Sequence, residues 1–377
     1  MWYILFLMLG LLSVGVEVVL VSAWVFARFG YSIKQKPCYT PKTCVIVPCK
    51  DVDKYFIENM DAICSQNYEK YRVIFVTDST KDPAYKSLQN LYSKNPKISI
   101  VVSDFIDGCS GKIAALLTGI QYSQDAEVYV FADSDIKPHQ NWLSDLVAHL
   151  YYDDVGVTTG YRWFFASSFS SLFVSCWNMV NSLSLFFNAY NFAWGGSMAI
   201  KKDLFDALNV GEEWKKGFSD DLILTRIVKD AGFSIRFLPA CISESPVEGN
   251  ITSFVTWGTR QLTWMRWYFP SYWIFSIVGA VALKTATISG FLLVGFGFIL
   301  PGLLMISTIF FEMLSGALAH STFRKKMKYP HDAFGHFLSY ALLMPVVFFV
   351  IAYNDIVSIF KNEITWGGRV YQKPKKK

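Results

Sequence analysis

The chain has 377 residues, of which 53% are hydrophobic and 17% charged, and its formal net charge is +5. A positive charge this small excludes the strongly basic surface of a nucleic-acid-binding protein, and 17% aromatic residues is high for a soluble protein. The seven cysteines form no CxxC pair, which fits reduced thiols in a cytosolic domain.

Residues 1–28 are predicted to form a transmembrane anchor. Residues 1–27 carry one charge, Glu17, and are long enough to cross ~30 Å of hydrocarbon as a helix. A cleaved signal peptide is disfavoured because the segment lacks a basic start and its apolar run is too long.

Residues 40–250 are predicted to form one globular domain. Runs rich in β-branched residues alternate with segments of helical spacing. The expected strands are 43–48, 71–77, 98–103 and 127–133, and the expected helices between them are 54–66, 83–92 and 111–123. This alternation predicts an α/β fold, Rossmann-like, with a mostly parallel sheet covered on both faces.

The most informative motif is Asp133-Ser134-Asp135, which follows an apolar run that ends at Ala132. Two carboxylates two residues apart on an extended strand point the same way. Such a pair at the exposed end of a buried strand suits a hard divalent cation, Mg²⁺ or Mn²⁺, that keeps open positions for phosphate oxygens.

The second half of the domain is less regular. We expect a strand over 155–163, a helix lying in the membrane surface within the uncharged segment 164–193, and a turn at 194–197 that leads into a strand. Ser219-Asp220-Asp221 opens a predicted helix, and 251–268 is an aromatic and basic segment at the membrane boundary.

Two apolar stretches follow. Residues 269–311, whose only charge is Lys284, are predicted to form a transmembrane hairpin. Residues 333–360 are predicted to be transmembrane or re-entrant, with the re-entrant form slightly favoured because Pro345 can break the helix. A single crossing would place the basic tail, 361–377, on the opposite side from the other basic clusters.

Basic clusters follow the first span, the hairpin and the last apolar stretch: Lys34 and Lys36; Arg324, Lys325, Lys326 and Lys328; and Lys373 with Lys375–Lys377. By the positive-inside tendency, these clusters and the globular domain face the cytoplasm. The expected location is therefore integral to an endomembrane (endoplasmic reticulum or Golgi) or to a bacterial inner membrane.

The order of these features resembles that of inverting glycosyltransferases of families 2 and 21, in particular the ceramide glucosyltransferases and similar bacterial lipid glycosyltransferases. The matching segments, in order, are Val45-Ile46-Val47-Pro48, Gln66-Asn67-Tyr68, Asp78, Gly111-Lys112, Asp133-Ser134-Asp135, Trp194-Gly195-Gly196-Ser197, Ser219-Asp220-Asp221 and Arg266-Trp267. The resemblance covers about residues 40 to 268 and implies the GT-A type of fold.

The resemblance also implies roles for these residues. Asp135 is expected to bind the metal, with Asp133 shared between the metal and the ribose. Asp221 is the expected general base and Asp220 the second choice. Pro48, Asp78 and Lys112 are expected on the donor side, and Arg266 and Trp267 among the catalytic residues. The family pattern QxxRW would need glutamine or arginine at position 263, where this chain has Thr263. This departure puts the roles of Arg266 and Trp267 in doubt and disfavours a polymer product.

Each of these features also has a purely structural explanation. The acidic motif could be a solvated turn, Asp220 and Asp221 could complement a helix dipole, and Asp78 could form an Asx turn. Lys112 could be an exposed lysine, and the aromatic residues 257–267 an interfacial belt.

The leading hypothesis is a metal-dependent, membrane-anchored enzyme that moves one hexose, expected to be glucose from UDP-glucose, onto the hydroxyl of a lipid such as ceramide. Its partners would be a nucleotide-sugar donor, a lipid acceptor and the membrane, without nucleic acid. The alternative is a processive polysaccharide synthase of the cellulose or hyaluronan synthase type. A lipid-binding or transport protein with an inactive transferase domain is the third hypothesis.

Overall fold

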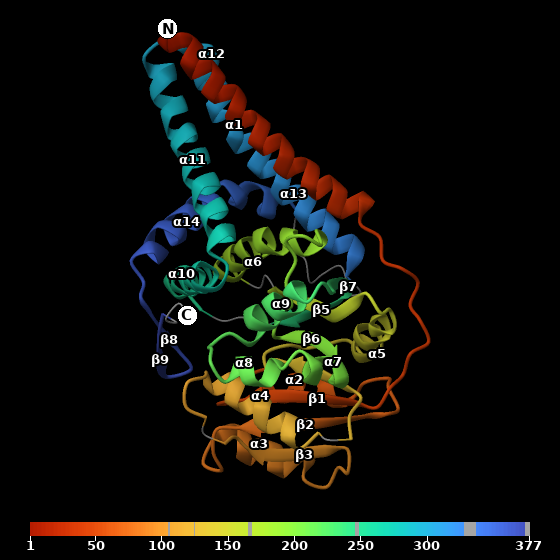
Figure 1. Ribbon diagram of the computed structural model, residues 1–377. Helices are drawn as coiled ribbons and strands as arrows, with labels where there is room; N and C mark the ends of the chain where they lie inside the picture. Colours follow the sequence, from red (N-terminus) through yellow and green to blue (C-terminus); the bar gives the residue numbers. More distant parts are fainter. Residues whose placement is uncertain (105, 124, 165–167, 246–248, 328–336, 374–377) are drawn as a thin grey trace.

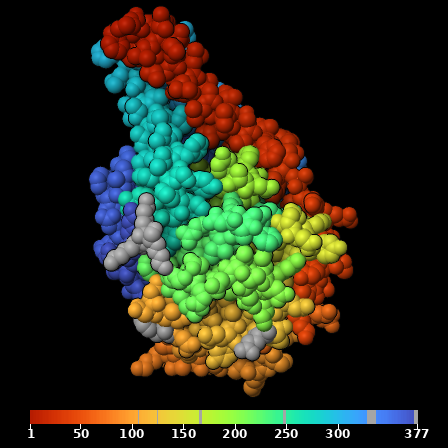
Figure 2. Space-filling view, viewed as in Figure 1, coloured from red at the N-terminus to blue at the C-terminus, as the bar shows by residue number. Residues whose placement is uncertain are grey.

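The computed structural model describes the chain except residues 105, 124, 165–167, 246–248, 328–336 and 374–377. A seven-stranded sheet lies at one end of the molecule and long apolar helices extend from the other, with α6 and α10 between them (Figure 1). The space-filling view shows the same shape, broad at the sheet and narrow at the helical end (Figure 2).

The sheet has the order β3-β2-β1-β4-β6-β5-β7. Its strands are β1 (Thr43–Cys49), β2 (Tyr71–Thr77), β3 (Ile98–Val102), β4 (Val128–Ala132), β5 (Val155–Phe164), β6 (Ser197–Lys201) and β7 (Ser234–Ser245). All neighbouring pairs are parallel except those that β6 makes with β4 and β5. The predicted α/β architecture with a mostly parallel sheet is therefore confirmed.

Helices cover both faces of the sheet because successive side chains of each strand point to opposite sides. Val45 and Val47 of β1 lie in one hydrophobic core, and Cys44 and Ile46 lie in the other. The helices of the domain are α2 (Phe56–Cys64), α3 (Pro83–Tyr92), α4 (Gly111–Gln121), α5 (Trp142–Ala148), α7 (Lys202–Ala207), α8 (Val210–Trp214) and α9 (Asp220–Asp230).

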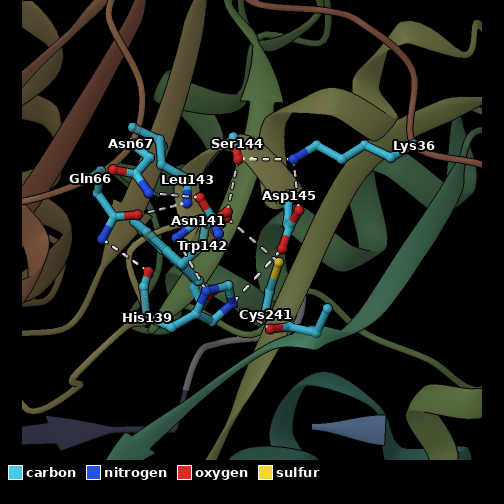
Figure 3. Close-up of polar contacts among 12 residues, drawn as sticks. Lys36, Gln66, Asn67, His139, Asn141, Trp142, Leu143, Ser144, Asp145 and Cys241 are labelled. Atoms are coloured by element: carbon cyan, nitrogen blue, oxygen red, sulfur yellow. Dashed lines mark hydrogen bonds and ion pairs between the residues drawn. The ribbon is translucent and has the colours of Figure 1, made fainter. Parts of the chain in front are cut away.

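A polar network fixes the segment that follows the acidic motif of β4 (Figure 3). Gln66 accepts from the backbone N–H of Leu143 at 2.9 Å and donates to the carbonyl of His139 at 3.2 Å. Lys36, which follows the N-terminal helix, pairs with Asp145 at 2.7 Å. Gln66, the first residue of the Gln66-Asn67-Tyr68 match, thus holds the chain between β4 and α5 in place.

Within the described residues, four helices are long and apolar enough to span a membrane, as expected of an integral membrane protein. They are formed by α1 (Trp2–Val25) with a π-helical turn (Phe26–Gly30), by α11 (Pro270–Gly295), by α12 (Ile299–Ile306) with α13 (Thr308–Lys326), and by α14 (Phe337–Ile359). The second arm of the predicted hairpin therefore continues beyond residue 311, to Lys326.

The reason for the longer arm is an ionic group buried between three helices. Glu17 of α1, Lys284 of α11 and Glu312 of α13 are at most 4% exposed, and Lys284 pairs with Glu312. Glu312 faces its countercharge inside the bundle, so the charge that ended the apolar run in the sequence does not end the helix.

α14 is one continuous helix through Pro345, so the predicted break at this proline is not formed. Near its start, the ring of Tyr340 stacks 5.8 Å from Trp163 of β5, and near its end Ser358 accepts from Trp273 at 2.9 Å. Between these points Asn354 lies 3.0 Å from Thr259 of α10 (Ile251–Tyr268). Both ends of α14 therefore lie beside the domain.

α6 (Phe169–Ser182), predicted as a helix that lies in the membrane surface, is largely buried against other parts of the protein. It packs against β5, α10 and α14, and the hydroxyls of Ser175 and Tyr340 lie 3.1 Å apart. Its many serines satisfy local backbone carbonyls and neighbouring hydroxyls, which allows an uncharged but polar helix to be buried.

The predicted basic tail is partly folded. β8 (Glu363–Trp366) and β9 (Arg369–Gln372) form an antiparallel hairpin whose turn, Gly367-Gly368, has positive φ at both residues. Glycine adopts this conformation without strain. The hairpin packs on α10 through Trp264, Ile364 and Tyr371.

Arg266 joins α10 to the segment that leads into this hairpin, since its guanidinium donates to the carbonyls of Ile359 and Lys361. Replacing Arg266 with methionine keeps an apolar stem and removes both hydrogen bonds. We expect the free energy of unfolding to fall by about 2 kcal/mol, measured by denaturation in detergent, and protease cleavage after residue 360 to become faster.

Arg226→Met, at an exposed position of α9, is the matched control and should leave both measurements unchanged. Loss of transfer at unchanged stability would instead assign Arg266 the catalytic role that the family resemblance implies.

Candidate functional site

Polar side chains follow successive strands along one edge of the sheet. Asp78 follows β2, and Asp133 and Asp135 follow β4. β5 runs parallel to β4 because both pair antiparallel with β6 between them, so Arg162 near the end of β5 lies at the same edge. In open α/β sheets this carboxyl edge is where ligands bind.

Lys112, in the first turn of α4, connects two groups of carboxylates. Its Nζ lies 2.7 Å from Asp133 Oδ1 and 3.2 Å from Asp220 Oδ2, and it donates to the carbonyl of Gly195 at 3.3 Å. The strand that ends in the acidic motif and the helix that begins with Ser219-Asp220-Asp221 thus share one ammonium group. Lys112 is therefore part of the cluster and is not an exposed surface lysine.

Burial and neighbouring charges shift the pKa values of Lys112 and Asp220 in this cluster. Burial lowers the pKa of Lys112, but Asp133, Asp220 and Asp221 raise it by more, so the ammonium stays charged. Burial raises the pKa of Asp220 to about 7, even though Lys112 opposes the shift. Asp220 is only 2% exposed, which explains the size of the effect.

Gly195 and Gly196 allow the backbone to come close to these groups. A Cβ atom on Gly195 would lie 2.4 Å from Asp220 Oδ2 and 2.8 Å from Lys112 Nζ. One on Gly196 would lie 2.8 Å from Asp133 Oδ2. Any larger residue in this turn would displace the carboxylates or the lysine.

Asp221 is held differently from Asp220. Its Oδ1 accepts from Ser219 Oγ at 2.5 Å and from the N–H of Leu222 at 2.7 Å, while its Oδ2 accepts from the N–H of Gly195 at 3.3 Å. The carboxylate is half-buried, so it is fixed in direction and still reachable by a substrate.

One carboxylate oxygen of Asp135 is available to bind a cation. Its Oδ1 is buried without a hydrogen-bond partner among the described residues, and its Oδ2 lies 3.5 Å from Arg162 Nη1. Burial and then the charge of Asp133 raise the pKa of Asp135, so a cation there would be favoured. The described residues contain no group of three or more His, Cys, Asp or Glu side chains with metal-site geometry. Asp133 and Asp135 therefore fit a metal ion whose other ligands are phosphate oxygens or water.

The predicted donor-side residues lie towards the far end of the edge. Pro48 is in β1, beside Val76 of β2. Asp78 Oδ2 pairs with Lys50 Nζ at 3.0 Å, and Lys50 also donates to the carbonyl of Gly367 at 2.8 Å. The turn of the C-terminal hairpin thus lies over this part of the site.

Arg266 and Trp267, which were predicted among the catalytic residues, also lie outside the carboxylate cluster. Arg266 contacts the end of α14, as described above, and Trp267 packs with its ring centroid 5.2 Å from that of Trp264. Trp267 still borders the site, because the hydrophobic cluster that contains Trp264 and Trp267 also includes Phe218 and Leu222, which flank the Asp220-Asp221 pair in the sequence.

Two parts of the site, Arg162 and the C-terminal hairpin, were not predicted from the sequence. Arg162 could have been singled out, because it is the only charged residue in the predicted strand 155–163. The hairpin could also have been predicted, since Gly367-Gly368 between alternating apolar residues is typical of a two-residue turn. Its Arg369 guanidinium lies 3.2 Å from where a Cβ of Gly111 would be, and Tyr371 OH is 3.5 Å from the N–H of Gly111.

Residues 6–377 match the model of glycosyl transferase family 21. The chain belongs to this family. The resemblance that the ordered motifs indicated is thus confirmed at the level of the family.

Curated relatives of this family 21 chain are distant. It is 23% identical over 240 residues to "Probable glycosyltransferase YdaM" of Bacillus subtilis, which covers 60% of this chain and 53% of the relative. It is 30% identical over 105 residues to "Glycosyltransferase AglE" of Haloferax volcanii, covering 27% of this chain and 33% of the relative. The chain thus spans about half of one relative and a third of the other.

Among solved structures, the family 21 chain is similar to the mannosyltransferase PcManGT from Pyrobaculum calidifontis, which was solved in complex with GDP-Man and Mn²⁺. The TM-score is 0.54 at 16% sequence identity, covering 94% of this chain and 99% of the other. This likeness supports the GT-A type of fold along nearly the whole chain.

The raised pKa of Asp220 predicts a pH-dependent stability. The unfolded chain ionises this carboxyl near 3.8 and the folded chain near 7, so folding favours the protonated form. The stability that this preference contributes is complete below about pH 3.8 and is lost as the pH rises through 7. Relative to wild type, Asp220→Asn should therefore become more stable as the pH is raised from 5 to 8.

Thermal unfolding of both proteins in detergent across this range checks the expectation. Asp230→Asn, at the exposed end of the same helix, is the matched control and should follow wild type. A difference between Asp220→Asn and wild type that does not change with pH would contradict the assigned shift.

Proposed function

We propose that this protein transfers a single hexose, glucose from UDP-glucose, to the hydroxyl of a membrane lipid of the ceramide type, with inversion at the anomeric carbon. The observation that carries the proposal is the cluster around Lys112, in which Asp133 at the end of β4 and Asp220 at the start of α9 share one ammonium group. One group is suited to a metal-bound diphosphate, and the other to the acceptor.

The donor would lie along the carboxyl edge of the sheet. The nucleoside would contact Pro48 and Asp78, and the diphosphate would lie near Asp133 and Asp135. Mg²⁺ or Mn²⁺ held by these two carboxylates would neutralise the charge that develops on the leaving diphosphate. Lys112 would add a fixed positive charge next to Asp133, and the similar PcManGT, solved with GDP-Man and Mn²⁺, supports such an arrangement.

Asp221 would act as the general base. The acceptor hydroxyl must lose its proton as it attacks, and a carboxylate held in a fixed direction can accept that proton. The hydrogen bonds from Ser219, Leu222 and Gly195 supply the fixed direction. Asp220 would instead hold Lys112 in place.

The membrane would supply the acceptor from the side of α6, α10 and α14. The chain leaving α1 and the end of α13 both lie beside the domain, since Lys36 pairs with Asp145 and Lys326 donates to the carbonyl of Tyr31. The described residues of the first two basic clusters thus lie on the side of the catalytic domain, which supports a cytoplasmic orientation in an endomembrane or a bacterial inner membrane.

Incubation of purified protein with radiolabelled nucleotide sugars and ceramide-containing lipid micelles tests the proposal. The expected product is lipid that carries one hexose, formed fastest with UDP-glucose and lost when a chelator removes divalent cations. Label found only in long water-soluble polymer would favour a processive synthase. Failure to transfer from any donor with Mg²⁺ or Mn²⁺ present would favour an inactive domain.

Replacement of Asp221 with asparagine keeps the side chain's size and removes the base. We expect the transfer rate to fall by 10²-fold or more, with donor affinity unchanged when measured by calorimetry with UDP. Asp230→Asn on the same helix should keep the wild-type rate. Normal turnover of Asp221→Asn would remove this residue from the mechanism.

A further inference from the structure

A pocket lies where the first membrane helix meets the catalytic domain. Its volume is about 530 Å³, and it is lined by the end of α1, the segment 186–190 and the start of β7. Lys326 at the end of α13 donates to the carbonyl of Tyr31 at 2.9 Å, and Arg28 Nε donates to Ser321 Oγ at 3.1 Å. α1 and α13, which lie side by side (Figure 1), thus end at one level, so the pocket lies at the depth of the lipid headgroups.

The polar end of the pocket carries two cations. Lys34 Nζ and Arg236 Cζ lie 4.6 and 4.7 Å from the centre of the same ring, that of Tyr152. Lys34 has no ion pair or hydrogen bond with any residue that the structure describes. Arg236 lies 3.5 Å from Asp154, but its Nη1 is buried without a hydrogen-bond partner in the described part of the protein. With one carboxylate for two cations, this end of the pocket keeps a net positive charge and suits an anion.

The opposite wall of the pocket is apolar and partly open to the surroundings. The ring of Phe26, in the π-helical turn after α1, stacks 5.2 Å from that of Phe187. Phe26 and Tyr190 are nevertheless 44% and 58% exposed. Exposed apolar side chains of α1, such as Val25, continue this wall towards the hydrocarbon. A ligand that fits both ends has an anionic head and apolar chains.

The pocket lies away from the groups proposed to carry out the transfer. Arg236 is near the start of β7, beside Thr158 of β5, whereas Arg162 at the carboxyl edge lies beside Ser243, near the end of β7. The pocket is therefore at the amino end of these two strands and the carboxylate cluster at the other. A lipid in the pocket would not reach Asp221 and would not be the acceptor.

We propose that this pocket binds the headgroup of an anionic phospholipid that is a bound component of the protein and not its substrate. The phosphate lies between Lys34 and Arg236, and the chains lie along Phe26 and α1. Ammonium and guanidinium groups form charge-assisted hydrogen bonds with phosphate oxygens, and basic residues next to a membrane helix attract anionic lipids. Because the pocket is built from both α1 and β7, the lipid ties the catalytic domain to the membrane surface.

Native mass spectrometry of the full chain in detergent micelles tests this inference. The protein is mixed with equal amounts of phosphatidylglycerol and phosphatidylcholine, whose headgroups differ in net charge. We expect phosphatidylglycerol to bind more tightly by about tenfold or more, because only its headgroup carries a net charge opposite to that of Lys34 and Arg236.

Lys34→Glu reverses the charge of an exposed side chain without an ionic partner, so the fold should be kept. We expect it to weaken phosphatidylglycerol binding by about tenfold or more, and Arg236→Gln by about fivefold. Lys97→Glu is the matched control and should bind as wild type does. Lys97 also lies over a tyrosine ring, 5.4 Å from that of Tyr71, but next to β3, the strand farthest from the apolar helices.

Equal binding of the two phospholipids, or unchanged binding in Lys34→Glu, would overturn the inference. Displacement of phosphatidylglycerol by inorganic phosphate would make the pocket a site for a soluble anion, and displacement by ceramide would place the acceptor there. Either result would also overturn it. Selective binding of phosphatidylglycerol without transfer to any lipid would instead contradict the proposed function and leave this inference standing.

Discussion

The site depends on one buried ammonium group. Lys112 lies between Asp133, which ends the central strand, and Asp220, which begins α9, so two segments distant in the sequence share a single countercharge. Removing one partner of a buried ion pair typically destabilises a protein by about 3–5 kcal/mol. Without Lys112, Asp133 and Asp220 would lose the ammonium group that they share. The lysine thereby ties the end of β4 to the start of α9.

The sheet order arranges the parts of the site along one edge. The strands β3, β2 and β1 lie farthest from the apolar helices, and β5 and β7 lie nearest to them. Asp78, the Asp133-Asp135 pair and Arg162 therefore follow one another along this edge towards the apolar helices. α14 packs against α6 and α10 at the end of the edge that is nearest to those helices.

Much of this organisation could be predicted from the sequence. Strand and helix periodicity gave the α/β domain, and the ordered motifs gave the family, because local patterning directly reflects which side chains are buried. The position of Lys112 could be suspected from its place at a helix start. Its bridge to Asp220 could not be, since that contact depends on the close approach of Gly195, which only the folded backbone reveals.

The errors in prediction have a common physical origin. Counting charges ended the hairpin before Glu312, and the composition of the basic tail gave no sign of the β8–β9 hairpin, yet Glu312 pairs inside the bundle and that hairpin packs on α10. In each case a long-range partner decided the outcome, and composition within one segment carries no information about such a partner.

The ionic group within the helical bundle also bears on how the chain is made. Glu17 lies in α1, which is synthesised well before Lys284 and Glu312. An isolated α1 would hold an acidic side chain in hydrocarbon with no cation to meet it, which costs several kcal/mol. α1 is therefore unstable in the lipid until α11 and α13 pack against it. Assembly of the helices, rather than insertion of each helix in turn, is the step that completes the folding of this protein.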